Sequence, residues 1–151
     1  MSTERSQSGP GVRVLIVDDQ ARARQSLRAL LMTWPQVGEL REAGDGLAAL
    51  EKIAESRPDL VLIDARMPSL DGLETTKRIK ARWPEVQVIV LSMSPEYADR
   101  ARQAGAEAFA VKGDLGRQLR LILGAISTCE QRLGFDSEPR EWEYTTEADN
   151  E

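Results

Sequence analysis

The sequence predicts an α/β fold in which helices cover both faces of a parallel β-sheet. Short apolar segments rich in valine, isoleucine and leucine alternate along the chain with longer segments that are apolar on one side only. Strands that are buried on both faces are apolar along their whole length, whereas the helices that cover them carry a single apolar stripe. The chain has 151 residues, the length of one ordinary domain. We therefore expect one doubly wound domain built on one sheet.

Five segments have the composition of strands. The first follows Gly11 and runs into an acidic pair, and the third runs into Asp64. The second contains charged residues and is the weakest of the five. The predicted strands cover residues 12–17, 37–43, 60–63, 86–91 and 107–111.

The segments between these strands have apolar residues at helical spacing. The first predicted helix ends before Pro35, and the fourth begins at Pro95 and ends before Gly105. The predicted helices cover residues 20–34, 47–54, 72–82 and 95–104, and a last one carries Leu115, Leu119, Ile122, Leu123 and Ile126. Right-handed crossovers between the strands predict a flavodoxin-like (βα)5 sandwich of three layers, with sheet order 2-1-3-4-5.

The folded domain is predicted to cover residues 12–131. Residues 1–11 are polar and glycine-containing, and we expect them to be disordered. Residues 130–151 contain eight acidic and two basic side chains, although the net charge of the whole chain is only −5. We expect residues 132–151 to form a disordered acidic tail, and the rest of the chain to be electrically balanced.

The composition excludes several classes of function. The chain has no histidine, which excludes mechanisms that use an imidazole base and most kinds of zinc site. No basic stripe indicates nucleic-acid binding, and no apolar run is long enough for a membrane span. The single cysteine, Cys129, has no partner for an internal disulfide. We therefore expect a reducing, cytoplasmic location.

Polar or charged residues follow four of the five predicted strands. The first strand ends at the pair Asp18 and Asp19, the third at Asp64, the fourth at Ser92 and the fifth at Lys112. The carboxyl ends of parallel strands lie at one edge of the sheet, which is where open α/β sheets bind their ligands. We therefore expect these side chains to meet in one crevice.

Their chemistry suits phosphoryl transfer. Three carboxylates in one crevice repel each other, and a hard cation such as Mg²⁺ relieves that repulsion through oxygen ligands. The ammonium of Lys112 and the hydroxyl of Ser92 would stabilise the negative charge of a phosphoryl group. Asp64 is then the predicted nucleophile, because carboxylates form aspartyl-phosphate intermediates.

Four motifs in this order resemble the receiver domain of two-component response regulators, and most closely the receivers that precede LuxR-type DNA-binding domains. They are VLIVDD (14–19), LVLIDARMPSLDG (60–72), VIVLS (88–92) and AFAVK (108–112). Each motif is weak alone, but all four stand in order at the predicted strand ends. The resemblance extends from Val12 to the end of the last predicted helix.

The resemblance implies a role for each site residue. Asp64 would be the phosphoacceptor, and Lys112 and Ser92 would contact the phosphoryl group. Mg²⁺ would be bound directly by Asp19, with Asp18 helping directly or through water, and by Asp64 and the backbone carbonyl of Arg66.

The resemblance also implies a switch. Phe109 would change rotamer as Ser92 moves toward the phosphoryl group, and Arg66 and Ser94 match positions that tune the lifetime of the acyl phosphate. Phe109 stands where tyrosine is frequent, and the segment after Ser92 is about two residues shorter than usual. Gly113 replaces a frequent proline. These departures concern the switch more than phosphorylation itself.

The implied function is a stand-alone receiver, a phosphoacceptor without turnover of a separate substrate. A histidine kinase or phosphotransfer protein would phosphorylate Asp64 with Mg²⁺ as cofactor. Because we expect no DNA-binding or catalytic domain after residue 131, the signal would leave by protein contact at helix four, strand five and helix five (residues 95–130). Homodimerisation stays open.

Two other functions compete with this one. A receiver-fold scaffold would bind partners without phosphorylation, and the short segment after Ser92 favours it weakly. A phosphatase of the haloacid-dehalogenase kind would need an acid two residues after its nucleophile, where this chain has Arg66.

Simpler structural roles also compete for individual residues. Asp18 and Asp19 could cap a helix. Lys112 could pair with any surface acid, and Phe109 could be a plain core residue.

Overall fold

The computed structural model describes residues 11–122, in which strands and helices alternate. The strands are β1 (Val12–Val17), β2 (Val37–Ala43), β3 (Leu60–Asp64), β4 (Gln87–Ser92) and β5 (Ala108–Val111). The helices are α2 (Ala21–Leu31), α3 (Gly46–Glu55), α4 (Gly72–Arg82), α5 (Ala98–Gln103), the 3₁₀ turns η1 (Pro95–Tyr97) and η2 (Lys112–Asp114), and residues 115–122. No helix within residues 11–122 is long and apolar enough to cross a membrane. The tail predicted at 132–151, most of the segment predicted at 1–11, and Leu123, Ile126 and Cys129 lie outside the described residues.

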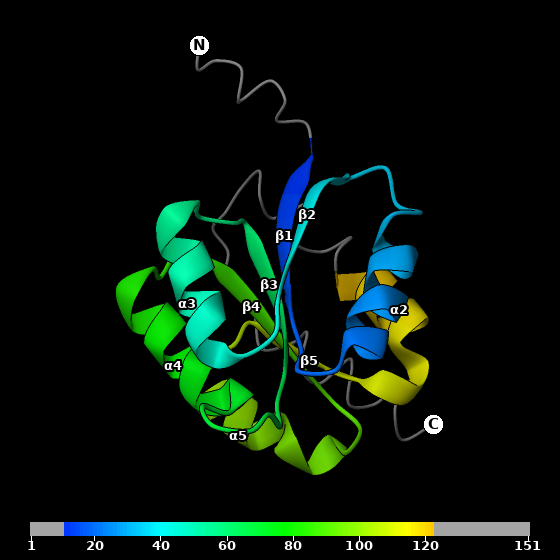
Figure 1. The fold of residues 1–151 in the computed structure, drawn as a ribbon. Coiled ribbons are helices and arrows are strands. Elements are labelled where there is room, and N and C mark those ends of the chain that lie inside the picture. The colour runs from blue at the N-terminus through cyan, green and yellow to red at the C-terminus, as the bar shows by residue number, and fades with distance from the viewer. Residues whose placement is uncertain (1–10, 123–151) are drawn as a thin grey trace.

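The strands form one parallel sheet in the order β2-β1-β3-β4-β5, which confirms the predicted topology. Val17 in β1 is the partner of Ile63 in β3, and Asp64 is the partner of Leu91 in β4. The carboxyl ends of the strands lie at the lower edge of the sheet in Figure 1. The register therefore brings Asp18 and Asp64 to the ends of neighbouring strands.

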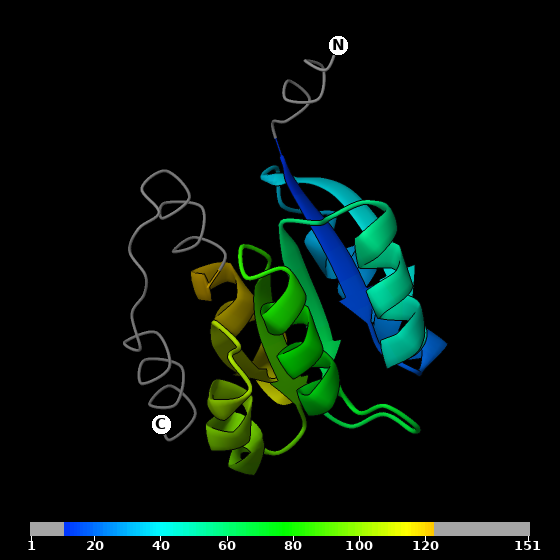
Figure 2. The ribbon, with the colours of Figure 1, turned by 90° about the vertical axis from the view of Figure 1, so that its left-hand side faces the viewer.

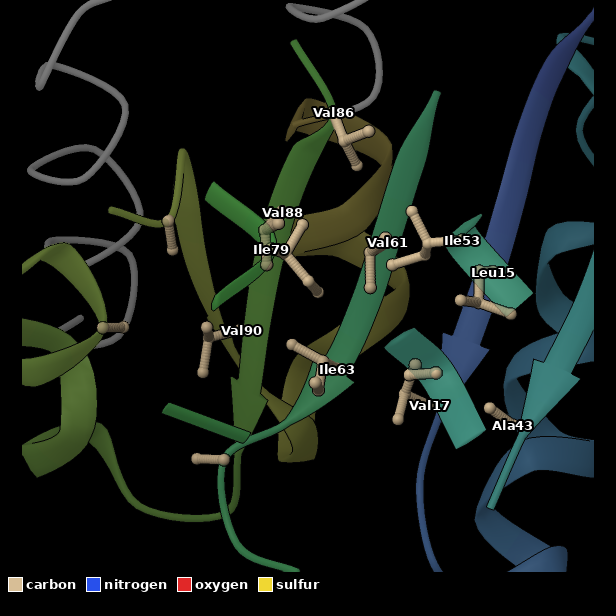
Figure 3. Close-up of a cluster of buried hydrophobic side chains, with 14 of the residues drawn as sticks. Leu15, Val17, Ala43, Ile53, Val61, Ile63, Ile79, Val86, Val88 and Val90 are labelled. Carbon is tan, nitrogen blue, oxygen red and sulfur yellow. The ribbon is translucent and has the colours of Figure 1, made fainter. Parts of the chain in front are cut away.

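Helices cover both faces of the sheet and enclose two hydrophobic layers (Figures 1 and 2). One layer contains Leu27 and Leu31 of α2 together with Leu119 and Ile122 of the last described helix. The other contains residues of α3, α4 and α5, and Figure 3 shows ten of its side chains with labels. These ten are Leu15, Val17, Ala43, Ile53, Val61, Ile63, Ile79, Val86, Val88 and Val90.

The two layers explain why the central strands are apolar throughout. In β3, Val61 and Ile63 point into the layer below α3 and α4, whereas Leu60 and Leu62 point into the opposite layer. All four side chains are fully buried. Burying a side chain of this size contributes about 1.5–3 kcal/mol. The sheet therefore holds its strand ends on a rigid support.

The first helix is shorter than the predicted 20–34, because α2 ends at Leu31. The amides of Thr33 and Trp34 donate to the carbonyls of Leu30 and Leu31, and these bonds reach back three residues rather than four. Such bonds tighten the chain into a final turn before Pro35, which helices rarely include after their first turn.

The predicted helix 95–104 forms as two pieces, η1 and α5. The amide of Tyr97 reaches back to the carbonyl of Ser94, three residues away, and no side chain caps this start. The helix ends where the sequence predicted it, before Gly105, which has a φ of 100°. The amide of Ala106 donates to the carbonyl of Ala101, which closes the helix in a Schellman motif.

Candidate functional site

The predicted strand ends do meet, and Lys112 joins two of them. Its Nζ lies 2.9 Å from Oδ2 of Asp18 and 3.0 Å from Oδ1 of Asp64. Asp18 follows β1, Asp64 ends β3 and Lys112 follows β5, so three separate strands supply one ion cluster. The alternative that Lys112 pairs with an unrelated surface acid is wrong.

Asp18 is the fixed centre of the cluster. It is 1% exposed, and both of its carboxylate oxygens have protein donors, since Lys112 binds Oδ2 and the amide of Gln20 donates to Oδ1 at 3.0 Å. Its own amide donates to the carbonyl of Ala43 in β2. The alternative that Asp18 and Asp19 cap a helix is wrong, because the N-cap residue of α2 is Gln20.

The acidic residues form a set that fits a hard divalent cation. Asp18, Asp19 and Asp64 each offer a carboxylate oxygen, and these three oxygens lie within 4.8 Å of one another. Asp19 is exposed and Asp64 is partly buried, so a cation can reach both. An all-oxygen donor set is the kind that Mg²⁺ prefers, with water completing its shell. The predicted Mg²⁺ therefore fits the residues present.

The pKa values of Asp64 and Lys112 are both raised. Burial is the largest cause for Asp64 and raises the pKa of its carboxyl above 3.8, with the charges of Asp18 and Asp19 acting in the same direction and Lys112 opposing them. Burial would lower the pKa of Lys112, but its hydrogen bonds to Asp18 and Asp64 outweigh burial and raise it above 10.5. Lys112 therefore stays charged at neutral pH. A carboxyl whose pKa is perturbed by burial and by a specific charge partner is common at functional sites.

Ser92 ends β4, between the strands that carry Asp64 and Lys112. It is 2% exposed and is the register partner of Val111, the residue before Lys112. Its Oγ accepts a 3.1 Å hydrogen bond from the amide of Ser94. A hydroxyl that accepts one bond still has its proton to donate. Ser92 thus lies at the predicted carboxyl edge of the sheet, and its hydroxyl can donate a hydrogen bond.

The loop after Asp64 packs closely against that residue. The amide of Gly72 donates to the carbonyl of Ala65 at 3.0 Å, and Asp71 caps α4 by accepting from the amide of Glu74. A Cβ on Gly72 would lie 1.9 Å from the carbonyl oxygen of Asp64. Only glycine fits this approach between the start of α4 and the end of β3.

The roles predicted for Arg66 and Phe109 remain predictions, as do the phosphoacceptor, metal-ligand and phosphoryl-contact roles of the other site residues. Arg66 is exposed in the loop after Asp64, and nothing in the described residues tests its carbonyl as a metal ligand. Phe109 is 3% exposed and belongs to the hydrophobic layer below α3, α4 and α5, with Tyr97 packed against the same layer. Its place in the core is therefore clear, and its role as a switch is untested.

Two residues that the sequence did not indicate, Arg24 and Gln118, hold the site in place. Arg24 of α2 donates through Nη1 to the carbonyl of Asp18 at 2.7 Å and through Nε to Glu42 of β2 at 3.1 Å. Gln118 is buried, and its amide bonds to both the N–H and the C=O of Val111. Arginine and glutamine on amphipathic helices look like ordinary solvent-facing residues, so the sequence carried no signal for these contacts.

Comparison with known proteins points to one family. The family described as "Response regulator receiver domain" matches residues 14–122. A protein-glutamate methylesterase/protein-glutamine glutaminase of Nocardioides sp. is 36% identical over 125 residues, which are 78% of this chain but only 34% of that relative. The response regulator domain of Thermotoga maritima CheB is 31% identical with a TM-score of 0.68, over 84% of this chain and 99% of that one. A LuxR-family two-component response regulator from Aurantimonas sp. is 27% identical with a TM-score of 0.72, over 77% and 84%.

Proposed function

Because the chain belongs to the response regulator receiver family, we propose that Asp64 accepts a phosphoryl group from a histidine kinase or phosphotransfer protein. The observation that carries the proposal is the cluster of Asp18, Asp64 and Lys112, with Asp19 beside it. A nucleophile, a fixed positive charge and a set of oxygen ligands are the parts that phosphoryl transfer needs.

In this mechanism one oxygen of Asp64 attacks the phosphorus atom. Lys112 contacts Oδ1, so we assign the attack to Oδ2. A new O–P bond forms as the bond between phosphorus and the donor breaks, and the donor leaves with that electron pair. The ammonium of Lys112 and the hydroxyl of Ser92 would then bind the phosphoryl oxygens.

The metal has a defined place in this proposal. Asp18, Asp19, Asp64 and the carbonyl of Arg66 would hold Mg²⁺, which supplies positive charge to the transferring group. Asp18 already has donors on both oxygens, whereas Asp19 is exposed, and we therefore assign Asp19 as the principal additional ligand. Lys112 is shared between Asp18 and Asp64, and a cation would take over part of its task of neutralising these carboxylates.

We assign signal output to protein contact rather than to turnover of a substrate. The contact face would comprise α5, β5 and the helix at 115–122, next to Ser92 and Lys112. The methylesterase relative is an enzyme, but the chain spans only about a third of its length. We further propose a cytoplasmic location for this receiver and no direct binding of nucleic acid or membrane.

Incubation with Mg²⁺ and acetyl phosphate tests the proposal by intact-mass measurement. The wild-type chain should gain the mass of one phosphoryl group, and it should not do so in excess EDTA. Asp64→Asn should gain nothing, whereas Asp59→Asn should behave as wild type, because Asp59 is an exposed acid at the other edge of the sheet. An equal gain in Asp64→Asn would contradict the assignment of Asp64 as the phosphoacceptor. An unmodified wild type would contradict the proposal and favour the receiver-fold scaffold.

A further inference from the structure

Arg24 joins three elements behind the acidic pair. From α2 its guanidinium reaches the carbonyl oxygen of Asp18 with Nη1, at 2.7 Å, and the carboxylate of Glu42 in β2 with Nε, at 3.1 Å. The side chain of Arg24 is 21% exposed, so these bonds are largely shielded from solvent. A planar guanidinium can hold two acceptors at fixed angles, which a lysine ammonium does less rigidly.

The carbonyl that Arg24 binds belongs to the peptide between Asp18 and Asp19. The other polar groups of Asp18 are bound already, by Lys112, by the amide of Gln20 and by the carbonyl of Ala43. The bond from Arg24 therefore fixes the plane of the peptide from which the exposed Asp19 projects. Gln20, at the N-cap of α2, makes no side-chain cap, so the only side-chain bond that the described residues make within the turn itself runs from its amide to Oδ1 of Asp18.

Charge balance favours a positioning role over a purely electrostatic one. A lone guanidinium beside a cation site would weaken cation binding, but Glu42 pairs with Arg24 and also with Arg28, at 3.1 and 3.0 Å. The single negative charge of Glu42 offsets one of these two positive charges, which reduces the repulsion that Arg24 would exert on a cation. What remains specific to Arg24 is its hydrogen bond to the Asp18 carbonyl.

We propose that Arg24 is a positioning residue that holds the Asp18–Asp19 turn in the geometry that binds a divalent cation. This rests on the proposed function, because it takes Asp18 and Asp19 as ligands of Mg²⁺. Groups that orient metal ligands typically change metal affinity by 10- to 100-fold when they are removed. Arg24 acts through the backbone of Asp18 and needs no contact with the cation.

Calorimetric titration of the full chain with Mg²⁺ tests this. Arg24→Gln should raise the Kd for Mg²⁺ on the order of tenfold, and Arg24→Lys should raise it less. Arg28→Gln is the matched control, since Arg28 lies on the same helix and pairs with Glu42 but makes no bond to Asp18. Its Kd should stay near that of wild type.

Two further readouts separate positioning from general destabilisation. Hydrogen exchange at the amide of Gln20, which donates to Oδ1 of Asp18, should become faster in Arg24→Gln and stay unchanged in Arg28→Gln. In the acetyl phosphate reaction, the Mg²⁺ concentration for half-maximal rate should rise in Arg24→Gln, whereas the rate at saturating Mg²⁺ should match that of wild type.

The outcomes distinguish this inference from the function on which it rests. Equal Kd values for Arg24→Gln and Arg28→Gln, or tighter Mg²⁺ binding by Arg24→Gln, would overturn the positioning role while phosphorylation of wild type still stands. A wild-type chain that neither binds Mg²⁺ nor accepts a phosphoryl group would overturn both.

Discussion

Lys112 contacts two carboxylates at once, and this shared position sets the charge balance of the site. Asp18 is almost completely buried and Asp64 is partly buried, so both rely on the ammonium for compensation. Removing one partner of a buried ion pair is costly because the remaining charge is left without solvent. The pKa of Lys112 is raised, so its contribution to stability is fully present below pH 10.5 and is lost as the pH rises through the raised value.

We expect Lys112→Met to lower the free energy of unfolding by about 3 kcal/mol in Mg²⁺-free buffer. Urea denaturation at neutral pH with EDTA measures this loss. Lys77→Met is the control, since Lys77 is exposed and its Nζ lies 4.0 Å from Oε1 of Glu74. Equal stability of the two variants would show that Asp18 and Asp64 do not depend on Lys112.

The carboxyl of Asp64 gives the stability a defined pH dependence in the absence of metal. Its pKa is higher in the folded chain than the ordinary 3.8, chiefly because of burial. The folded state therefore holds the proton more tightly than the unfolded state, and the contribution of Asp64 to stability falls as the pH rises from 3.8 through the raised value.

Asp64→Asn should remove this fall. The free energy of unfolding, measured in EDTA, should fall for wild type relative to Asp64→Asn as the pH rises through that window. A difference that stays constant with pH would show that burial does not perturb Asp64.

At the scale of elements, the site depends on how the start of α4 meets the end of β3. The amide of Gly72 bonds to Ala65, and its α-carbon lies against the carbonyl of Asp64. β3 cannot move away easily, because it is paired with β1 on one side and β4 on the other. Likewise, Gln118 ties the helix at 115–122 to the backbone of Val111, next to Lys112.

Gly72→Ala should therefore destabilise the chain by about 1–3 kcal/mol, as overpacking does, and should slow phosphorylation of Asp64. Thermal denaturation and the acetyl phosphate reaction measure the two effects. Gly116→Ala should act in the opposite direction and stabilise, because a Cβ there meets nothing closer than 3.8 Å and alanine favours a helix. If both glycine variants were equally stable, the contact at Asp64 would not be restrictive.

At the scale of the molecule, the sheet separates two hydrophobic layers, and every central strand contributes to both. The strand ends that carry Asp18, Asp64 and Ser92 are held by the same residues that form these layers. A cavity in either layer should therefore lower the stability of the whole domain rather than loosen one helix.

Leu62→Ala should lower the free energy of unfolding by about 2–5 kcal/mol, because Leu62 is fully buried below α2 and the helix at 115–122. Leu47→Ala should cost little, since Leu47 is 56% exposed. Urea denaturation followed by circular dichroism should show one cooperative transition for both variants. Two separate transitions in Leu62→Ala would contradict a single cooperative unit.

The strands, the sheet order and the site residues at the strand ends were predictable because each depends on a short pattern. The apolar runs of β1 and β3 are continuous, and Asp18 and Asp64 mark the points where these runs end. Helix ends were predicted less well. The end of α2 and the division between η1 and α5 depend on single hydrogen bonds of the Thr33 and Tyr97 amides, which residue types do not specify.

Local residue pattern was thus enough for the fold class, the topology and the set of chemical groups at one edge. It did not indicate that Lys112 would pair with Asp18 as well as with Asp64. Nor did it indicate that Arg24 would bind the Asp18 carbonyl or that Gln118 would bind the backbone of Val111. The pattern along a chain reports which face of an element is apolar. Contacts between polar side chains of distant elements depend on register, helix rotation and rotamer, and these are settled when the layers pack.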